Sequence, residues 1–82
     1  MNKILVSIYV LALEESYDIL IPINLNMKEA IDLIQETLIE LSEGAYQKKE
    51  AVLLYTEDGL VINTNNTVKF SGLTNGCKVL LK

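Results

Sequence analysis

Two runs of alternating apolar residues open the chain, from Ile4 to Leu13 and from Tyr17 to Ile23. Strict alternation is typical of β-strands with one buried face. Between the runs, Glu14-Glu15-Ser16 reads as a solvated turn, so the sequence predicts a β-hairpin. Pro22 lacks a backbone N–H and places the second strand at a sheet edge. The side chains expected in the core are those of Ile4, Val6, Ile8, Val10, Ile19, Ile21 and Ile23.

The apolar spacing changes from two to a helical period at Met27. Asn26 is a favourable N-cap, and Glu29 stands three residues later, as in a capping box. Gly44 supplies a stop signal for the helix. The stripe expected to pack on the sheet consists of Ala30, Ile31, Ile34, Leu38 and Leu41. The positions expected to face solvent are Lys28, Asp32, Gln35, Glu36 and Glu40.

Short strand-like runs follow the helix. Ala51–Tyr55 reads as a third strand, and the Glu57-Asp58-Gly59 turn leads to a short fourth strand at Leu60–Ile62. Asn75-Gly76 is a strong turn signal. The final strand, Cys77–Leu81, directs Val79 and Leu81 into the core. The sequence therefore predicts a single α+β domain over residues 1–82, with a mixed sheet of four or five strands. The handedness rule for crossover connections permits the last strand to lie parallel to the first.

The N-terminal run has a second interpretation. A lysine at position 3, then Ile4–Leu13 with Val10-Leu11-Ala12 as a cleavage site, is similar to a signal peptide. The alternation, the interrupting Ser7 and Tyr9 and the matching second run favour a strand. No run approaches the roughly 18 apolar residues of a membrane span. Cys77 is the one cysteine, which fits a reducing, cytoplasmic location.

Charge and chemistry exclude several function classes. Seven lysines, no arginine and eleven acidic residues give a net charge of −4, without the basic stripe that nucleic acids or anionic membranes need. The chain has no histidine, the usual general base and a common metal ligand. Cys77 is expected to be a small core residue. Glu14-Glu15 and Glu57-Asp58 are expected to be solvated turns. We therefore expect no catalytic residue, no metal and no cofactor.

The face opposite the predicted core carries too many apolar residues for an ordinary solvated sheet. Val52 and Leu54 are expected to join this face from the third strand, although alternation alone leaves the register of that strand open. Lys78, Lys82 and Asp18 would form a polar rim. Such a face indicates a contact surface, whereas single exposed apolar residues are ordinary. The apolar residues assigned to this face from the other strands are Leu5, Tyr9, Leu11, Leu20, Pro22 and Leu80.

Two stretches carry a family resemblance. Tyr17–Ile21 leading into Met27–Ile34, and Phe70–Gly76 followed by the final strand, resemble the YukD-like family of bacterial ubiquitin-like proteins, which are associated with type VII secretion. The element order is also similar to that of ubiquitin. The resemblance implies a ubiquitin-like β-grasp. The bias to Ile, Asn and Lys, without Arg, Trp or His, looks like a low-GC bacterium.

The resemblance also implies a function. Proteins of that family are regarded as non-enzymatic adaptors or regulators of the secretion machinery, so a secretion ATPase or a membrane component is the expected partner. The chain stops at Val79–Lys82 without a Gly-Gly tail, which argues against conjugation. By position, Leu54 and Leu80 fall near the patch by which ubiquitin is recognised. The docking residues expected are Leu5, Tyr9, Leu11, Leu20, Leu54 and Leu80. The alternative is a homodimer that uses the same face.

Overall fold

The computed structural model describes residues 2–82, in which the two N-terminal runs form the predicted hairpin. β1 (Lys3–Val10) and β2 (Glu15–Pro22) are antiparallel, with Ile4 opposite Ile21 and Val6 opposite Ile19. Paired residues point to the same face of a sheet. The isoleucines and valines of both strands therefore share the buried face, as the alternation predicts.

The turn of this hairpin begins earlier than predicted. β1 ends at Val10, because the N–H of Leu13 donates to the Val10 carbonyl (3.1 Å) and that of Glu14 donates to the Leu11 carbonyl (3.3 Å). Glu14 takes a left-handed backbone conformation, φ 54°. Leu11 and the residues up to Glu14 thus form the turn, and the predicted strand over residues 11–13 is wrong.

Helix α1 (Met27–Leu41) starts at the predicted capping box. The Asn26 Oδ1 accepts from the Glu29 N–H at 2.8 Å, and the Asn26 N–H donates to Glu29 Oε1 at 3.5 Å. Leu41, expected in the core, is half exposed because it is the last helical residue and lies beside the β1–β2 turn. Ile31 and Ile23, also expected in the core, are partly buried. The buried helical residues are Met27, Ala30, Ile34, Gln35 and Leu38.

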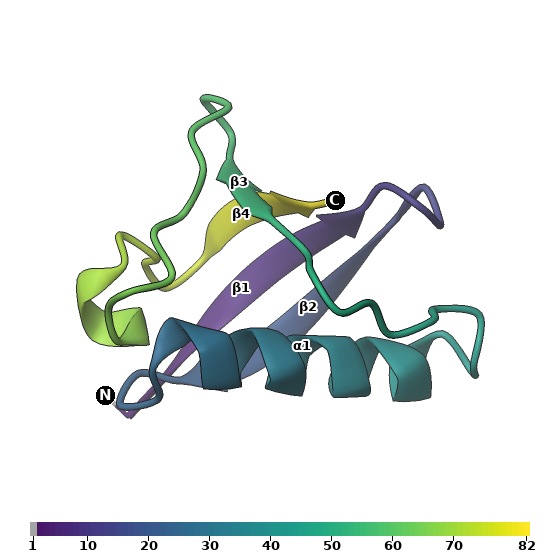
Figure 1. Ribbon diagram of the computed structural model, residues 1–82, viewed down its shortest axis with the longest axis horizontal. Helices are drawn as coiled ribbons and strands as arrows, with labels where there is room; N and C mark the ends of the chain where they lie inside the picture. The colour runs from purple at the N-terminus through teal and green to yellow at the C-terminus, as the bar shows by residue number, and fades with distance from the viewer. Residues whose placement is uncertain (1) are drawn as a thin grey trace.

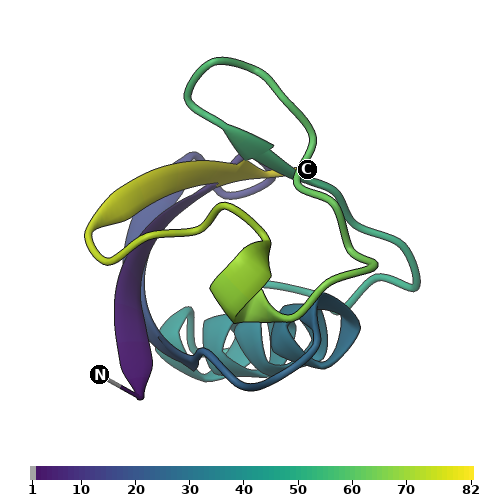
Figure 2. The ribbon, with the colours of Figure 1, turned by 90° about the vertical axis from the view of Figure 1, so that its left-hand side faces the viewer.

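The sheet has the order β2-β1-β4-β3 in the described part of the chain. β4 (Cys77–Leu81) runs parallel to β1 and pairs on its other side with the antiparallel β3 (Leu54–Thr56). The sheet curls around α1, and the short 3-10 helix η1 (Val68–Phe70) helps to close the open side (Figures 1 and 2). This arrangement confirms the α+β β-grasp that the element order predicts.

The strand predicted over Ala51–Tyr55 is shorter in the structure. The strand predicted at Leu60–Ile62 is absent from the part of the chain described. Leu53 exchanges two backbone hydrogen bonds with Lys82 (3.2 and 3.0 Å). Within the described residues, positions 51 and 52 belong to no strand. The predicted Leu60–Ile62 strand is reduced to a single bridge between Tyr55 and Val61, within a hairpin that projects from the body of the domain (Figure 1).

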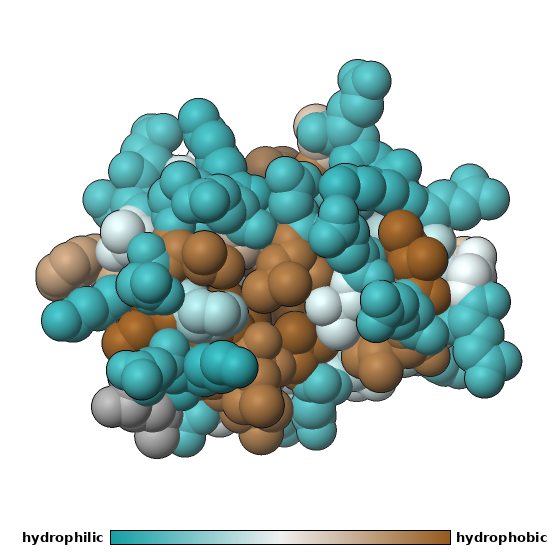
Figure 3. All heavy atoms as spheres, turned by 90° about the horizontal axis from the view of Figure 1, so that it is seen from below, coloured by the Kyte–Doolittle hydropathy of each residue, from teal (hydrophilic) through white to brown (hydrophobic). Residues whose placement is uncertain are grey.

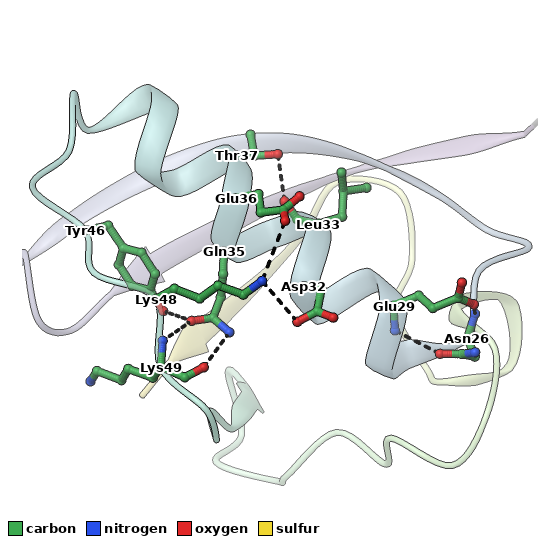
Figure 4. A network of polar contacts seen from close by, with 10 residues as sticks. All are labelled: Asn26, Glu29, Asp32, Leu33, Gln35, Glu36, Thr37, Tyr46, Lys48 and Lys49. Carbon is green, nitrogen blue, oxygen red and sulfur yellow. Dashed lines mark hydrogen bonds and ion pairs between the residues drawn. The ribbon is translucent and has the colours of Figure 1, made fainter.

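A buried glutamine holds the connection between α1 and β3 (Figure 4). The Gln35 Oε1 accepts from the Tyr46 hydroxyl and from the Lys49 N–H, both at 2.8 Å, and its Nε2 donates to the Lys49 carbonyl at 3.1 Å. Lys48 lies 3.6 Å from both Asp32 and Glu36. The assignment of Gln35 to the solvent-facing side is therefore wrong, since its amide satisfies backbone groups of the connection.

The register of β3 decides which of its residues face the core. Leu54 pairs with Leu81 and Thr56 with Val79, and both β4 residues face inward as predicted. Leu54 is consequently 2% exposed. Its expected place on the outer face is wrong, as is that of Val52, which is partly buried against the core. Tyr55 occupies the outer face instead.

Candidate protein-docking face

Four apolar side chains form a continuous row across the outer face of the sheet. Tyr9 is opposite Leu80, Leu80 is opposite Tyr55, and Tyr55 is bridged to Val61. Residues paired in this way lie side by side on one face. Tyr9 and Val61 are exposed, whereas Tyr55 and Leu80 are half-buried between them. We call Tyr9, Leu80, Tyr55 and Val61 the apolar row.

A second, smaller apolar area lies further along the sheet. Leu5 and Leu20 are opposite each other on β1 and β2, and Leu20 is 58% exposed. Between this pair and the apolar row, Asp18, Ser7 and Lys78 form a polar line across three strands. The outer face is therefore divided, and Asp18 and Lys78 lie across its middle rather than on a rim.

Each residue predicted for docking now has a place. Tyr9 and Leu80 belong to the apolar row, and Leu5 and Leu20 form the separate pair. Leu11 is exposed just beyond β1, where its N–H donates to the Leu81 carbonyl at 3.2 Å. Leu54 contributes to the core and is removed from the site.

Sequence reasoning missed Tyr55 and Val61. The Glu57-Asp58-Gly59 turn was the available signal, because a tight hairpin there sets Tyr55 opposite Val61. Leu53, beside Tyr55, is 46% exposed and extends the apolar surface towards Lys82. Choosing between Leu54 and its neighbours required the β3–β4 register, which alternation alone did not fix.

Two lysines border the apolar row on β4. Lys78 and Lys82 each stand two residues from Leu80, on the same face of the strand. The Lys82 Nζ lies 5.2 Å from the centroid of the Tyr55 ring, within the range of a cation–π contact. A hollow of about 440 Å³ is lined by Tyr9, Tyr55, Leu80, both lysines and Glu57, among others. The site thus combines an apolar surface, formed by Tyr9, Tyr55 and Leu80, with a lysine on each side of Leu80.

The side of the molecule that carries α1 is apolar in part as well. Figure 3 shows a brown band across this side, next to the teal polar groups. Leu41 is exposed, but Ile31 and Ile39 remain packed against the core. Ile31 and Ile39 therefore belong to the packing around the core, whereas no residue of the apolar row belongs to it.

Among residues 2–82, no group of three or more Cys, Asp or Glu side chains is arranged to hold a metal ion. Cys77 is partly buried against the core beside Val6, as expected for a small core residue. No helix between residues 2 and 82 has the length and apolarity to cross a bilayer.

Comparisons with known proteins identify the architecture. No protein-family model and no curated protein matches the chain. Among solved structures, it is similar to the ubiquitin-like domain of the Mycobacterium tuberculosis type VII secretion system protein ECCD1. The TM-score is 0.73 at 16% identity, over 99% of this chain and 98% of that domain. The chain has a ubiquitin-like fold.

Two further structures are similar at low identity. The EccD5 ubiquitin-like domain from Mycobacterium xenopi matches with a TM-score of 0.64 and 17% identity, over 100% of this chain and 94% of that domain. A chain of the MycP5-free ESX-5 inner membrane complex matches with a TM-score of 0.67 and 12% identity. That match covers 100% of this chain but 21% of the other. At such identities the likeness establishes the fold.

Proposed function

We propose that this chain is a non-enzymatic, cytoplasmic protein-interaction domain of a bacterial type VII secretion machinery, and that it docks through the apolar row. The observation that carries the proposal is the alignment of Tyr9, Leu80, Tyr55 and Val61 across neighbouring strands. A contiguous apolar surface that the core does not use is typical of an interaction site.

Aromatic residues make this row suited to binding. Tyrosines bury large apolar areas at interfaces while the hydroxyl stays hydrated, and they are enriched among the residues that dominate binding energy. Half-buried Leu80 lies between Tyr9 and Tyr55. A partner side chain that covers Leu80 would therefore contact both rings.

The structural neighbours support the choice of partner. Two of them are ubiquitin-like domains of EccD proteins, and a third is part of an ESX-5 inner membrane complex. The resemblance of Tyr17–Ile21 and Met27–Ile34 to YukD-like proteins points to the same machinery. The partner we propose is a secretion ATPase or a membrane component of that machinery.

The test is a crosslinked pull-down from the cells of origin with three baits of verified fold. The row variant is Tyr9→Ser/Tyr55→Ser. The matched control is Leu5→Ser/Leu20→Ser, which makes two similar changes on the same face beyond the polar line. We expect wild type and control to recover type VII components, and the row variant to lose at least about tenfold of that recovery, equivalent to about 1.4 kcal/mol.

Three results would contradict this proposal. Equal recovery by the row variant would place the contact elsewhere. Loss with the Leu5/Leu20 control alone would move it to the smaller apolar pair. Recovery of nothing except further copies of the chain would favour the homodimer.

A further inference from the structure

The hollow over the apolar row is lined by more cationic than anionic side chains, whereas the chain as a whole is acidic. The chain carries a net charge of −4, yet Lys78 and Lys82 stand on either side of Leu80, and both line the hollow over the row. Glu57 supplies one carboxylate at the same hollow. A partner that crosses Leu80 therefore meets an ammonium group on each side of its apolar contact.

The direction of the row constrains the shape of the partner. The row runs across the strands, which are spaced about 4.8 Å apart, so its four side chains span roughly 14 Å. On a helix, residues three and four apart are neighbours at about 5–6 Å. A helix laid along the row would thus place one apolar residue near each of Tyr9, Leu80 and Tyr55.

An extended segment fits the row less well. Same-face residues of a strand repeat at about 6.7 Å, so their side chains fall out of step with the row after one contact. A strand also needs free backbone groups at a sheet edge. Leu80 lies on a strand that is paired on both sides, with Tyr9 and with Tyr55.

We infer that the segment docking on the apolar row is an amphipathic helix of the partner protein, with an apolar stripe flanked on both sides by Asp or Glu. This inference rests on the proposed function and specifies the chemistry of the partner. The carboxylates pair with Lys78 on one side of the stripe and with Lys82 on the other. Complementary charge of this kind sets the orientation and the specificity of docking.

Designed peptides test the inference directly. The probe is a helical peptide of about 18 residues with leucines at i, i+3, i+4 and i+7 flanked by glutamates, and its match has lysines in place of those glutamates. We expect the glutamate peptide to bind at least about tenfold more tightly, with NMR shifts centred on Tyr9, Tyr55 and Leu80. Binding should weaken as salt rises.

Charge reversal provides the decisive control. In Lys78→Glu/Lys82→Glu, the preference should switch to the lysine peptide. Lys28→Glu/Lys69→Glu makes the same change in net charge at exposed lysines outside the hollow, and it should keep the wild-type preference. Equal binding of both peptides to wild type, absence of binding, or shifts centred elsewhere would overturn the inference.

The same charge reversal separates this inference from the proposed function. Lys78→Glu/Lys82→Glu could still recover the type VII components that Tyr9→Ser/Tyr55→Ser loses. That result would support the apolar row as the contact surface and contradict an acidic helix as the segment that binds it. A second copy of the chain offers an acidic helix of its own, with Asp32, Glu36 and Glu40 on α1. Self-association in sedimentation that is abolished by Lys78→Glu/Lys82→Glu would contradict a separate partner.

Discussion

The Tyr46 hydroxyl donates a hydrogen bond of 2.8 Å to the Gln35 Oε1 inside the domain. The same oxygen accepts from the Lys49 N–H, and the amide nitrogen donates to the Lys49 carbonyl. One side chain on α1 therefore satisfies three groups of the connection that leads into β3. The connection leads into β3, whose pairing with β4 places Tyr55 on the outer face.

Replacing Gln35 by leucine should destabilise the domain. Gln35→Leu keeps most of the side-chain volume but leaves the Lys49 N–H and carbonyl and the Tyr46 hydroxyl without their partner. Losing a partner for buried polar groups costs about 1–3 kcal/mol, and we expect a loss in that range from urea unfolding. Glu40→Ala, an exposed change on the same helix, should stay within about 0.5 kcal/mol. Equal effects of the two changes would show that the network adds nothing.

Tyr46 should make the stability depend on pH in the alkaline range. Burial raises the pKa of Tyr46 above its ordinary value of 10.0. Above that value the unfolded chain loses the tyrosine proton before the folded protein does, so the unfolded state binds fewer protons and stability falls as pH rises. The stabilisation that Tyr46 contributes to the folded state is fully present below about pH 10. It is lost as the pH rises through the raised pKa of Tyr46.

The comparison with Tyr46→Phe isolates this effect. Unfolding free energies measured at about pH 9 and about pH 11 should fall more for wild type than for Tyr46→Phe. Desolvation also raises the pKa of Tyr17, as does its hydrogen bond to Glu15 at 3.0 Å, but Tyr17 is present in both proteins. Parallel pH profiles would mean that Tyr46 does not contribute.

Patterning alone recovers the parts of this fold that depend on local rules. The alternation in β1 and β2, the Asn26–Glu29 capping box and the inward face of β4 follow from period and capping chemistry. The turn predicted at Glu14-Glu15-Ser16 was placed too late, because the leucines at positions 11 and 13 continue the apolar run, although backbone hydrogen bonds reverse the chain over residues 11–14. Local pattern cannot report such a reversal when the residues remain apolar.

The candidate docking face was less predictable, because it depends on pairing between distant segments. Tyr9 and Leu80 were assigned to the outer face correctly, yet nothing in the sequence sets Leu80 beside Tyr55. Likewise, Gln35 has an ordinary solvent-facing identity, and its burial arises because Lys49 presents both backbone groups to it. These features belong to tertiary contacts rather than to periodicity.

The N-cap of α1 offers a third prediction. Asn26→Ala removes the acceptor of the Glu29 N–H and should cost about 1 kcal/mol in unfolding free energy. Asn26→Asp keeps a side-chain oxygen and should restore most of it. Asn24→Ala, an exposed change two residues earlier, should have little effect. If Asn26→Asp is as unstable as Asn26→Ala, the capping hydrogen bond is not the source of the loss.

Adjacent leucines test the register of β3. Leu54 is 2% exposed and Leu53 is 46% exposed, so the two side chains differ in environment although they are neighbours in sequence. Leu54→Ala should leave a cavity in the core and cost about 2–5 kcal/mol, whereas Leu53→Ala should change the unfolding free energy by about 0.5 kcal/mol or less. Thermal or urea unfolding of both variants measures this difference. The opposite register would direct Leu53 inward and Leu54 outward. A larger loss of unfolding free energy for Leu53→Ala than for Leu54→Ala would therefore show that β3 has the opposite register. Tyr55 would then face the core, and the apolar row would lose its central contact with Leu80.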